Sequence, residues 1–145
     1  SASYPLGEGY KLTSQSGDLR GQEVLPEHLA SVEQGDILLM TSCYEGLQQP
    51  WLSASTVTWL IEDRQIRMLG LQATGVQWQY ALKAEAPANS PIRRMLLGAN
   101  VPIAHPLVNI DTLQQGRVFY FGLPLRTPKM EASFIRAMAL EAPDA

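Results

Sequence analysis

The chain has little cysteine and no long apolar run. Its single cysteine, Cys43, excludes an internal disulfide and every metal motif built on several cysteines. The longest aliphatic run, Ile37-Leu38-Leu39-Met40, is far shorter than the roughly 20 residues of a membrane-spanning helix, and no cationic-then-apolar leader opens the chain. We therefore expect a soluble protein without membrane association. The cysteine content favours the cytoplasm, and the absence of an initial Met leaves a removed signal peptide open.

The sequence also lacks the common catalytic motifs. It contains no Gly-x-Ser-x-Gly elbow, no phosphate-binding Gly-Lys-Ser/Thr loop and no His-Glu-x-x-His helix. The two histidines, His28 and His105, do not stand at metal-ligand spacing, and Cys43 has no evident activating base. These absences predict neither a metal nor a cofactor, and no catalytic residue is identified from the sequence.

Lysine is absent from residues 87–127, although this is the cationic part of the chain. The segment carries a single acid, Asp111, and four arginines: Arg93, Arg94, Arg117 and Arg126. By contrast, residues 1–50 hold seven acids and two basic residues. Arginine offers a fixed fork of donors that suits a carboxylate or phosphate. The overall charge of −3 and the pI near 5.3 argue against nucleic-acid binding.

Length and composition predict one globular domain. The chain has 145 residues, of which 46% are hydrophobic and 17% charged, and no low-complexity linker interrupts it. We expect a single domain over residues 1–145, with loose ends at 1–3 and 142–145.

Periodicity predicts the elements of the first half. Alternation of apolar and polar residues over 10–13 is typical of a hairpin or edge strand. Pro26 and Gly35 mark the start and end of a short helix whose inward residues are Leu25, Leu29 and Val32. Residues 36–44 are predicted to form an apolar strand. Residues 57–83 alternate in three runs, which predicts three antiparallel strands with Trp59, Met68 and Trp78 on the inner face.

The second half adds two helices and two strands. Pro91, at the first helical position, predicts a helix over 90–97. The prolines at 102 and 106 limit residues 101–110 to an edge strand or a loop. Residues 117–123 are predicted to form a strand rich in aromatic residues. A last helix over 127–141 would pack through Phe134 and Met138. The expected class is α+β: an antiparallel sheet with three short helices packed on it.

Arg93 would stand in the first turn of the 90–97 helix, where the free amides and the dipole favour an acid. One interpretation is that Arg93 or Arg94 holds an anion together with these amides. The alternative is a solvent-facing side chain paired with an acid. Under the first, the ligand-binding residues are Arg93, Arg94, Arg117 and Arg126, with Trp78 or Tyr120 as pocket wall.

Four short runs resemble the order of landmarks in chorismate lyases, small α+β enzymes that release pyruvate from chorismate. These are Val24–Leu29, Asp36–Leu39, Gln49–Leu52 and Ser90–Leu96, so the resemblance covers residues 24–125. It implies an active-site Arg and Glu at positions occupied here by Gly35 and Gly122, so neither role can be carried over.

The sequence thus favours a binding domain for a small anionic ligand, with catalysis left open. The competing class is a noncatalytic interaction or assembly module, acting as a homodimer or with a protein partner, which the small number of charges and the missing catalytic residues favour.

Overall fold

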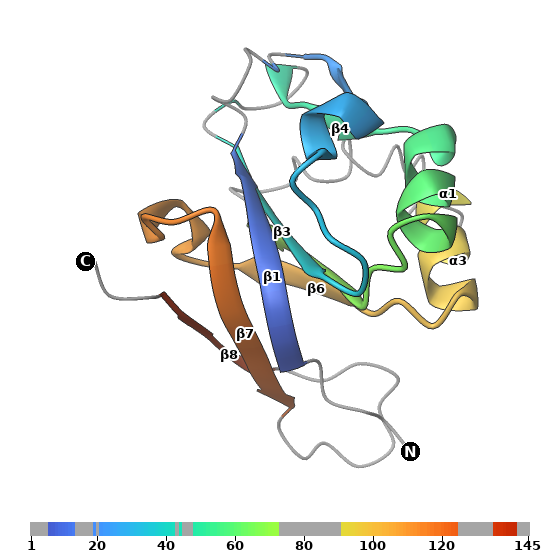
Figure 1. Ribbon diagram of the computed structural model, residues 1–145. Helices are drawn as coiled ribbons and strands as arrows, with labels where there is room; N and C mark the ends of the chain where they lie inside the picture. Colours follow the sequence, from blue (N-terminus) through green and yellow to red (C-terminus); the bar gives the residue numbers. More distant parts are fainter. Residues whose placement is uncertain are drawn as a thin grey trace.

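The computed structural model describes residues 6–13, 19, 21–42, 44, 48–72, 91–124 and 135–141. Their main feature is a six-stranded sheet in the order β6-β5-β3-β1-β7-β8 (Figure 1). The strands are β1 (Leu6–Thr13), β3 (Ile37–Thr41), β5 (Met68–Gln72), β6 (Ile103–Leu107), β7 (Arg117–Pro124) and β8 (Ile135–Leu140). A separate two-stranded sheet joins β2 (Glu23–Val24) and β4 (Trp51–Leu52).

The six-stranded sheet is mixed and mostly parallel. β1 pairs with β3, β3 with β5 and β5 with β6 in parallel, whereas β7 runs antiparallel to β1 and β8 antiparallel to β7. All five residues of β3 are buried, as expected for a parallel strand covered on both faces. Gly9 permits the close approach of β1 to β3, because a Cβ there would lie 2.8 Å from the Ile37 carbonyl oxygen.

Two α-helices of the described residues cover one face of the parallel half. α1 (Ala54–Glu62) begins after Ser53, whose Oγ accepts from the Thr56 amide at 3.3 Å, and α3 (Pro91–Gly98) packs beside it (Figure 1). Two short 3₁₀ turns, η1 (Pro26–Leu29) and η4 (Ile110–Thr112), complete the described elements.

Two apolar clusters lie on opposite faces of the sheet. The helix-side core contains residues of β3, β5, α1 and α3, among them Leu38, Leu69, Val57, Leu60, Ile92 and Leu96. The second core lies on the other face and comprises Ile37, Leu39, Met68, Ala104, Leu107, Ile110, Val118 and Tyr120. Successive residues of β3 point alternately into the two cores. The sheet therefore separates the core that contains the residues of α3 from the core that contains Tyr120.

The expectation of an antiparallel sheet with three helices is wrong. The alternating run that begins at Val57 is helix α1, and β5 pairs in parallel with β3 rather than in a hairpin. The Ser53 cap and the burial of Thr56, Val57 and Leu60 fit a helical period, which this apolar run satisfies as well as a strand period. Residues 73–83, with Trp78, lie outside the described residues.

The predicted last helix is also wrong in the part that the structure describes. Residues 135–140 form strand β8, in which Met138 lies opposite Phe121 of β7. Cross-strand packing on an aromatic strand outweighed the weak helical pattern. Residues 127–134, including Phe134, lie outside the described residues.

Other predictions hold. The apolar strand at 36–44, the helix at 90–97, an edge strand within 101–110 and the strand at 117–123 are confirmed as β3, α3, β6 and β7. The residues at 10–13 belong to an interior strand rather than an edge, and the helix at 26–35 is only a 3₁₀ turn, with Leu29 and Val32 buried but Leu25 exposed. Within the described ranges, no helix has the length and apolar character needed to cross a membrane.

Candidate functional site

The structure distributes the predicted ligand-binding residues over both faces of the sheet. Arg93 and Arg94 lie on α3, on the helix side, whereas Tyr120 belongs to the second core. Arg117 begins β7. Arg126 and Trp78 fall outside the described residues. The predicted donors and the predicted aromatic wall therefore do not form one pocket.

Arg93 on α3 stands near enough to His105 on β6, a residue that sequence reasoning left without a role, for its charge to act on the imidazole. Burial lowers the pKa of His105 below its ordinary value, and the nearby positive charge of Arg93 lowers the pKa further. The approach follows from the packing of α3 against β6. We call Arg93, Arg94 and His105 the α3–β6 site. His105 gave no sequence signal because its partner stands on another element.

Arg117 is held by carboxylates of its own chain. Its guanidinium donates to both carboxylate oxygens of the buried Asp36, at 2.5 and 2.9 Å, and lies 3.3 Å from Glu33 and 3.8 Å from Glu8. The hydrogen bond to Asp36 raises the pKa of Arg117 above its ordinary value, so its charge is permanent. This ion pair fixes the start of β7 to the turn that precedes β3.

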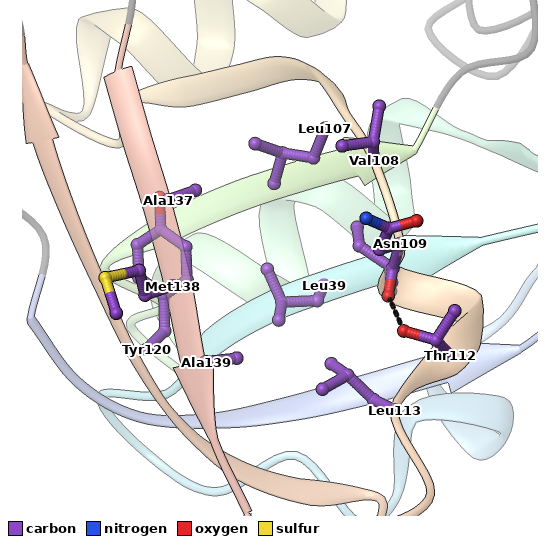
Figure 2. A pocket seen from close by; sticks show the side chains of 11 residues that line it. Leu39, Leu107, Val108, Asn109, Thr112, Leu113, Tyr120, Ala137, Met138 and Ala139 are labelled. Atoms are coloured by element: carbon purple, nitrogen blue, oxygen red, sulfur yellow. Dashed lines mark hydrogen bonds between the residues drawn. The ribbon is translucent and has the colours of Figure 1, made fainter.

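A cavity of about 260 Å³ lies on the second face, between β8 and the segment that follows β6 (Figure 2). Most of its lining side chains are aliphatic, and none is charged. They are Leu39, Leu107, Val108, Asn109, Ile110, Thr112, Leu113, Tyr120, Ala137, Met138 and Ala139. We call this space the Tyr120 cavity.

The wall formed by η4 is anchored by polar contacts outside the cavity. Gln72 at the end of β5 donates to the Asp111 carboxylate and accepts from the Asp111 amide, both at 2.9 Å. Lys11 of β1 donates to the Leu113 carbonyl. Thr112 donates to the Asn109 carbonyl at 2.7 Å, so its hydroxyl hydrogen is already used (Figure 2). These contacts hold η4 over the sheet and keep the cavity from collapsing.

Tyr120 is the most unusual polar group of the cavity. Its side chain is 2% exposed, and its Oη has no hydrogen-bond partner among the described residues. Burial raises the pKa of the phenol, so it stays protonated. Gly122 makes space for the hydroxyl, because a Cβ at that position would lie 2.5 Å from Oη.

Apolar side chains are also exposed along the outer part of the sheet. They come from β1, β7 and β8 and share the face opposite Tyr120, where the register aligns Leu6 with Phe121, Phe119 with Leu140 and Phe121 with Met138. The exposed members are Leu6, Phe119, Leu123, Met138 and Leu140, which we call the β7–β8 strip. Exposed apolar groups gathered in this way mark a surface suited to association.

Comparison with known proteins places the fold. No family model and no curated protein sequence matches the chain. Among solved structures, isatin hydrolase A from Labrenzia aggregata, bound to benzyl benzoate, matches with a TM-score of 0.69 at 20% identity, over 92% of this chain and 60% of the other. The fold resembles that of isatin hydrolases.

Two further isatin hydrolases agree. The enzyme from Ralstonia solanacearum has a TM-score of 0.69 at 18% identity, with 94% of this chain and 60% of that chain covered. One bound to the product analogue thioisatinate has a TM-score of 0.70 at 15% identity, covering 95% and 61%. The chain thus spans about 60% of the length of isatin hydrolase A. The resemblance to chorismate lyases is therefore wrong.

The described residues contain no group of three or more His, Cys, Asp or Glu side chains that could hold a metal ion. Nor does any serine or threonine hydroxyl of the described segments hydrogen-bond to a histidine. What this part of the chain offers is two places suited to binding: the α3–β6 site and the Tyr120 cavity.

Proposed function

We propose that this chain is a small-molecule-binding domain whose ligand is a small aromatic carboxylate held at the α3–β6 site. The observation that carries the proposal is that α3 packs on β6, so that the Arg93 charge acts on His105. Both side chains are nitrogen donors that bear positive charge when protonated, and they come from different elements of the fold. Convergent donors from two elements are typical of a binding site for an anion.

A bound carboxylate would relieve an unfavourable arrangement. The positive charge of Arg93 opposes protonation of His105. An anion between the two groups would favour the imidazolium and gain a second charge-assisted hydrogen bond. Binding is therefore coupled to uptake of a proton by His105, and affinity should rise as the pH falls towards the ordinary pKa of histidine, about 6.5.

The neighbouring structures support the size and aromatic character of the ligand. One isatin hydrolase is bound to benzyl benzoate and another to thioisatinate, both compact aromatic molecules. We propose binding rather than catalysis, because the described residues contain no nucleophile hydrogen-bonded to a base.

Titration with benzoate tests the proposal. The double variant Arg93→Gln, Arg94→Gln should weaken benzoate binding at least tenfold, about 1.4 kcal/mol, because charge-assisted hydrogen bonds exceed neutral ones. Calorimetry at about pH 6 and about pH 8 should show tighter binding at the lower pH in the wild type.

The control is Arg136→Gln, which removes one arginine charge from an exposed position on β8. It should leave benzoate affinity unchanged. Equal affinity of the folded double variant and the wild type would overturn the α3–β6 site. A loss of folding in the double variant would instead assign these arginines to a structural ion pair.

Self-association is the second candidate function. It is favoured by the β7–β8 strip together with the position of β8 at the end of the sheet, where one side of the strand has no neighbour in the described strand order. Open edge strands with apolar side chains pair readily with a second copy. Light scattering tests this candidate: a monomer at high concentration would exclude it, and a dimer dissociated by Leu140→Glu would support it.

A further inference from the structure

We propose that the Tyr120 cavity is a second binding site, which takes a compact neutral molecule made of one ring and a carboxamide group that pairs with Asn109 at the rim. None of Arg93, Arg94 and His105 lines this cavity, and it lies on the face of the sheet opposite α3. The site is therefore additional to the α3–β6 site and does not depend on it.

The size of the cavity sets the size of the ligand. Its volume is about 260 Å³. An apolar cavity of roughly 150 Å³ in another protein accommodates benzene, so this space holds one ring with a small substituent. It lies just below the roughly 300 Å³ at which sites for drug-sized ligands begin. A single-ring molecule therefore fits, whereas a dinucleotide does not.

The inner part of the cavity suits the ring. Leu39, Leu107 and Leu113 occupy its middle, with β8 on one side (Figure 2). β8 contributes Ala137 and Ala139, whose side chains are single methyl groups. Methyl groups along one wall and leucines in the middle leave space for a ring and offer it apolar contacts, which stabilise the bound state in proportion to the area buried.

Two of the three polar side chains in the lining have no hydrogen to donate to a ligand. Thr112 already donates its hydroxyl hydrogen to the Asn109 carbonyl at 2.7 Å. The Tyr120 hydroxyl is fully buried and lies against Gly122, which does not line the cavity, so a ligand cannot reach it. The third polar side chain is the Asn109 carboxamide.

Asn109 stands at the mouth of the cavity. It is exposed and follows Val108, which is 76% exposed, so this rim faces solvent and provides an entrance (Figure 2). The Asn109 backbone carbonyl accepts from the amide and the hydroxyl of Thr112, whereas the side chain makes no hydrogen bond within the described residues. The carboxamide therefore keeps both its N–H donors and its oxygen acceptor for a ligand.

The neighbouring donor and acceptor of Asn109 select the polar group of the ligand. A second carboxamide matches them with two hydrogen bonds, one in each direction. A carboxylate has only acceptors, so one of its oxygens would face the Asn109 oxygen, and the lining contains no Arg, Lys or His to offset the charge. A hydrocarbon forms neither hydrogen bond. A neutral carboxamide on a ring therefore suits both the inner part and the rim.

Benzamide is the probe, and α-methylstyrene, which has the same shape without the amide, is its matched control. Both should shift the methyl resonances of Ala137 and Ala139. Asn109→Gly removes the carboxamide and keeps the left-handed backbone, because φ here is 64° and glycine adopts such angles freely. This variant should weaken benzamide about fivefold or more and change α-methylstyrene by less than about twofold.

Two further variants locate the site. Ala137→Leu enlarges a lining side chain at an exposed position of β8 and should weaken both probes about fivefold or more, whereas Ala54→Leu, at an exposed position of α1, should not. The Arg93→Gln, Arg94→Gln variant should bind benzamide as the wild type does, and benzoate should not displace it. Failure of this site therefore leaves the α3–β6 proposal intact, and the reverse also holds.

Equal benzamide affinity in Asn109→Gly and the wild type would overturn the role of the carboxamide. Absence of shifts at Ala137 and Ala139 with either probe would overturn the site itself. Displacement of benzamide by benzoate would show that the cavity accepts a charged group, which contradicts selection of a neutral amide.

Discussion

The ion pair between Arg117 and Asp36 allows the most direct test of the structure. The Asp36 side chain is 3% exposed and accepts three hydrogen bonds, two from Arg117 and one from the Glu33 amide at 2.7 Å. Arg117→Met keeps the apolar stem and removes the two charged donors. Among the described residues, the buried carboxylate then keeps only the hydrogen bond from the Glu33 amide and loses its opposite charge.

The size of the effect follows from this geometry. Removing one partner of a buried ion pair costs roughly 3–5 kcal/mol. Because the Arg117 side chain is 35% exposed, water can replace part of its hydrogen bonding to Asp36. We therefore expect a loss of stability at the lower end of this range, about 3 kcal/mol. For a chain of this length that corresponds to a fall in Tm of roughly 6–12 °C. Asp36→Asn in the same chain removes the unpaired charge and should restore part of the stability.

Urea unfolding of the two single variants and the double variant measures this coupling. Arg136→Met on β8 is the control and should change stability by less than about 0.5 kcal/mol, as exposed positions do. A loss below about 0.5 kcal/mol for Arg117→Met would refute the reasoning. If that variant stayed stable but lost benzoate binding, Arg117 would be a ligand donor rather than a structural one.

Two further outcomes are expected. Folding lowers the pKa of His105, so the unfolded chain binds the proton more readily, and the free energy of unfolding should fall as the pH drops below about 6.5. His105→Gln should flatten this part of the stability profile, measured by urea unfolding at several pH values. An unchanged profile would contradict the role of His105. Gly122→Ala should displace the buried Tyr120 ring, because the new Cβ would lie 2.5 Å from Oη, and lower the free energy of unfolding by about 1–3 kcal/mol, measured by urea unfolding; an unchanged stability would show that the ring is not held against Gly122.

Several elements could be predicted from the sequence because their signals are local. Pro91 and the apolar positions Ile92 and Leu96 specify α3, and the uninterrupted aliphatic run of β3 can only be buried. The prolines at 102 and 106 limit β6 to an edge.

Sheet direction could not be predicted in the same way. The residues from Val57 to Ile61 satisfy both the strand period and the helix period, and the Ser53 cap, which favours the helix, lies outside the alternating run. Once 54–62 is a helix, it connects β3 to β5 as a crossover, and the two strands become parallel. The helix signal at 127–141 failed because Met138 gains more by facing Phe121 than by joining a helical stripe.

The sequence signals for the proposed sites were local. Arginine is unfavourable at a helix start, which drew attention to Arg93, and Tyr120 stands in an aromatic strand. Their surroundings were not, since Arg93 meets His105 only after α3 packs on β6. The Tyr120 cavity joins Leu39, Leu107 and Ala139, which are far apart in the sequence and individually ordinary.

The position of β1 has a consequence for how the chain acquires its structure. β1 lies between β3 and β7, so its first residue pairs with Phe121 while its other side pairs with β3 (Figure 1). Contacts between such distant segments slow folding, because a large loop must close before they form. During synthesis on the ribosome, one edge of β1 remains unpaired until β7 has been translated.

During that interval β1 is a template for misplaced strands from other chains. Glu8 and Lys11 put charge on both faces of the waiting strand, which discourages such pairing. A chain cut before β7 would keep this edge permanently open and should aggregate, whereas removal of β8 alone would leave β1 protected on both sides.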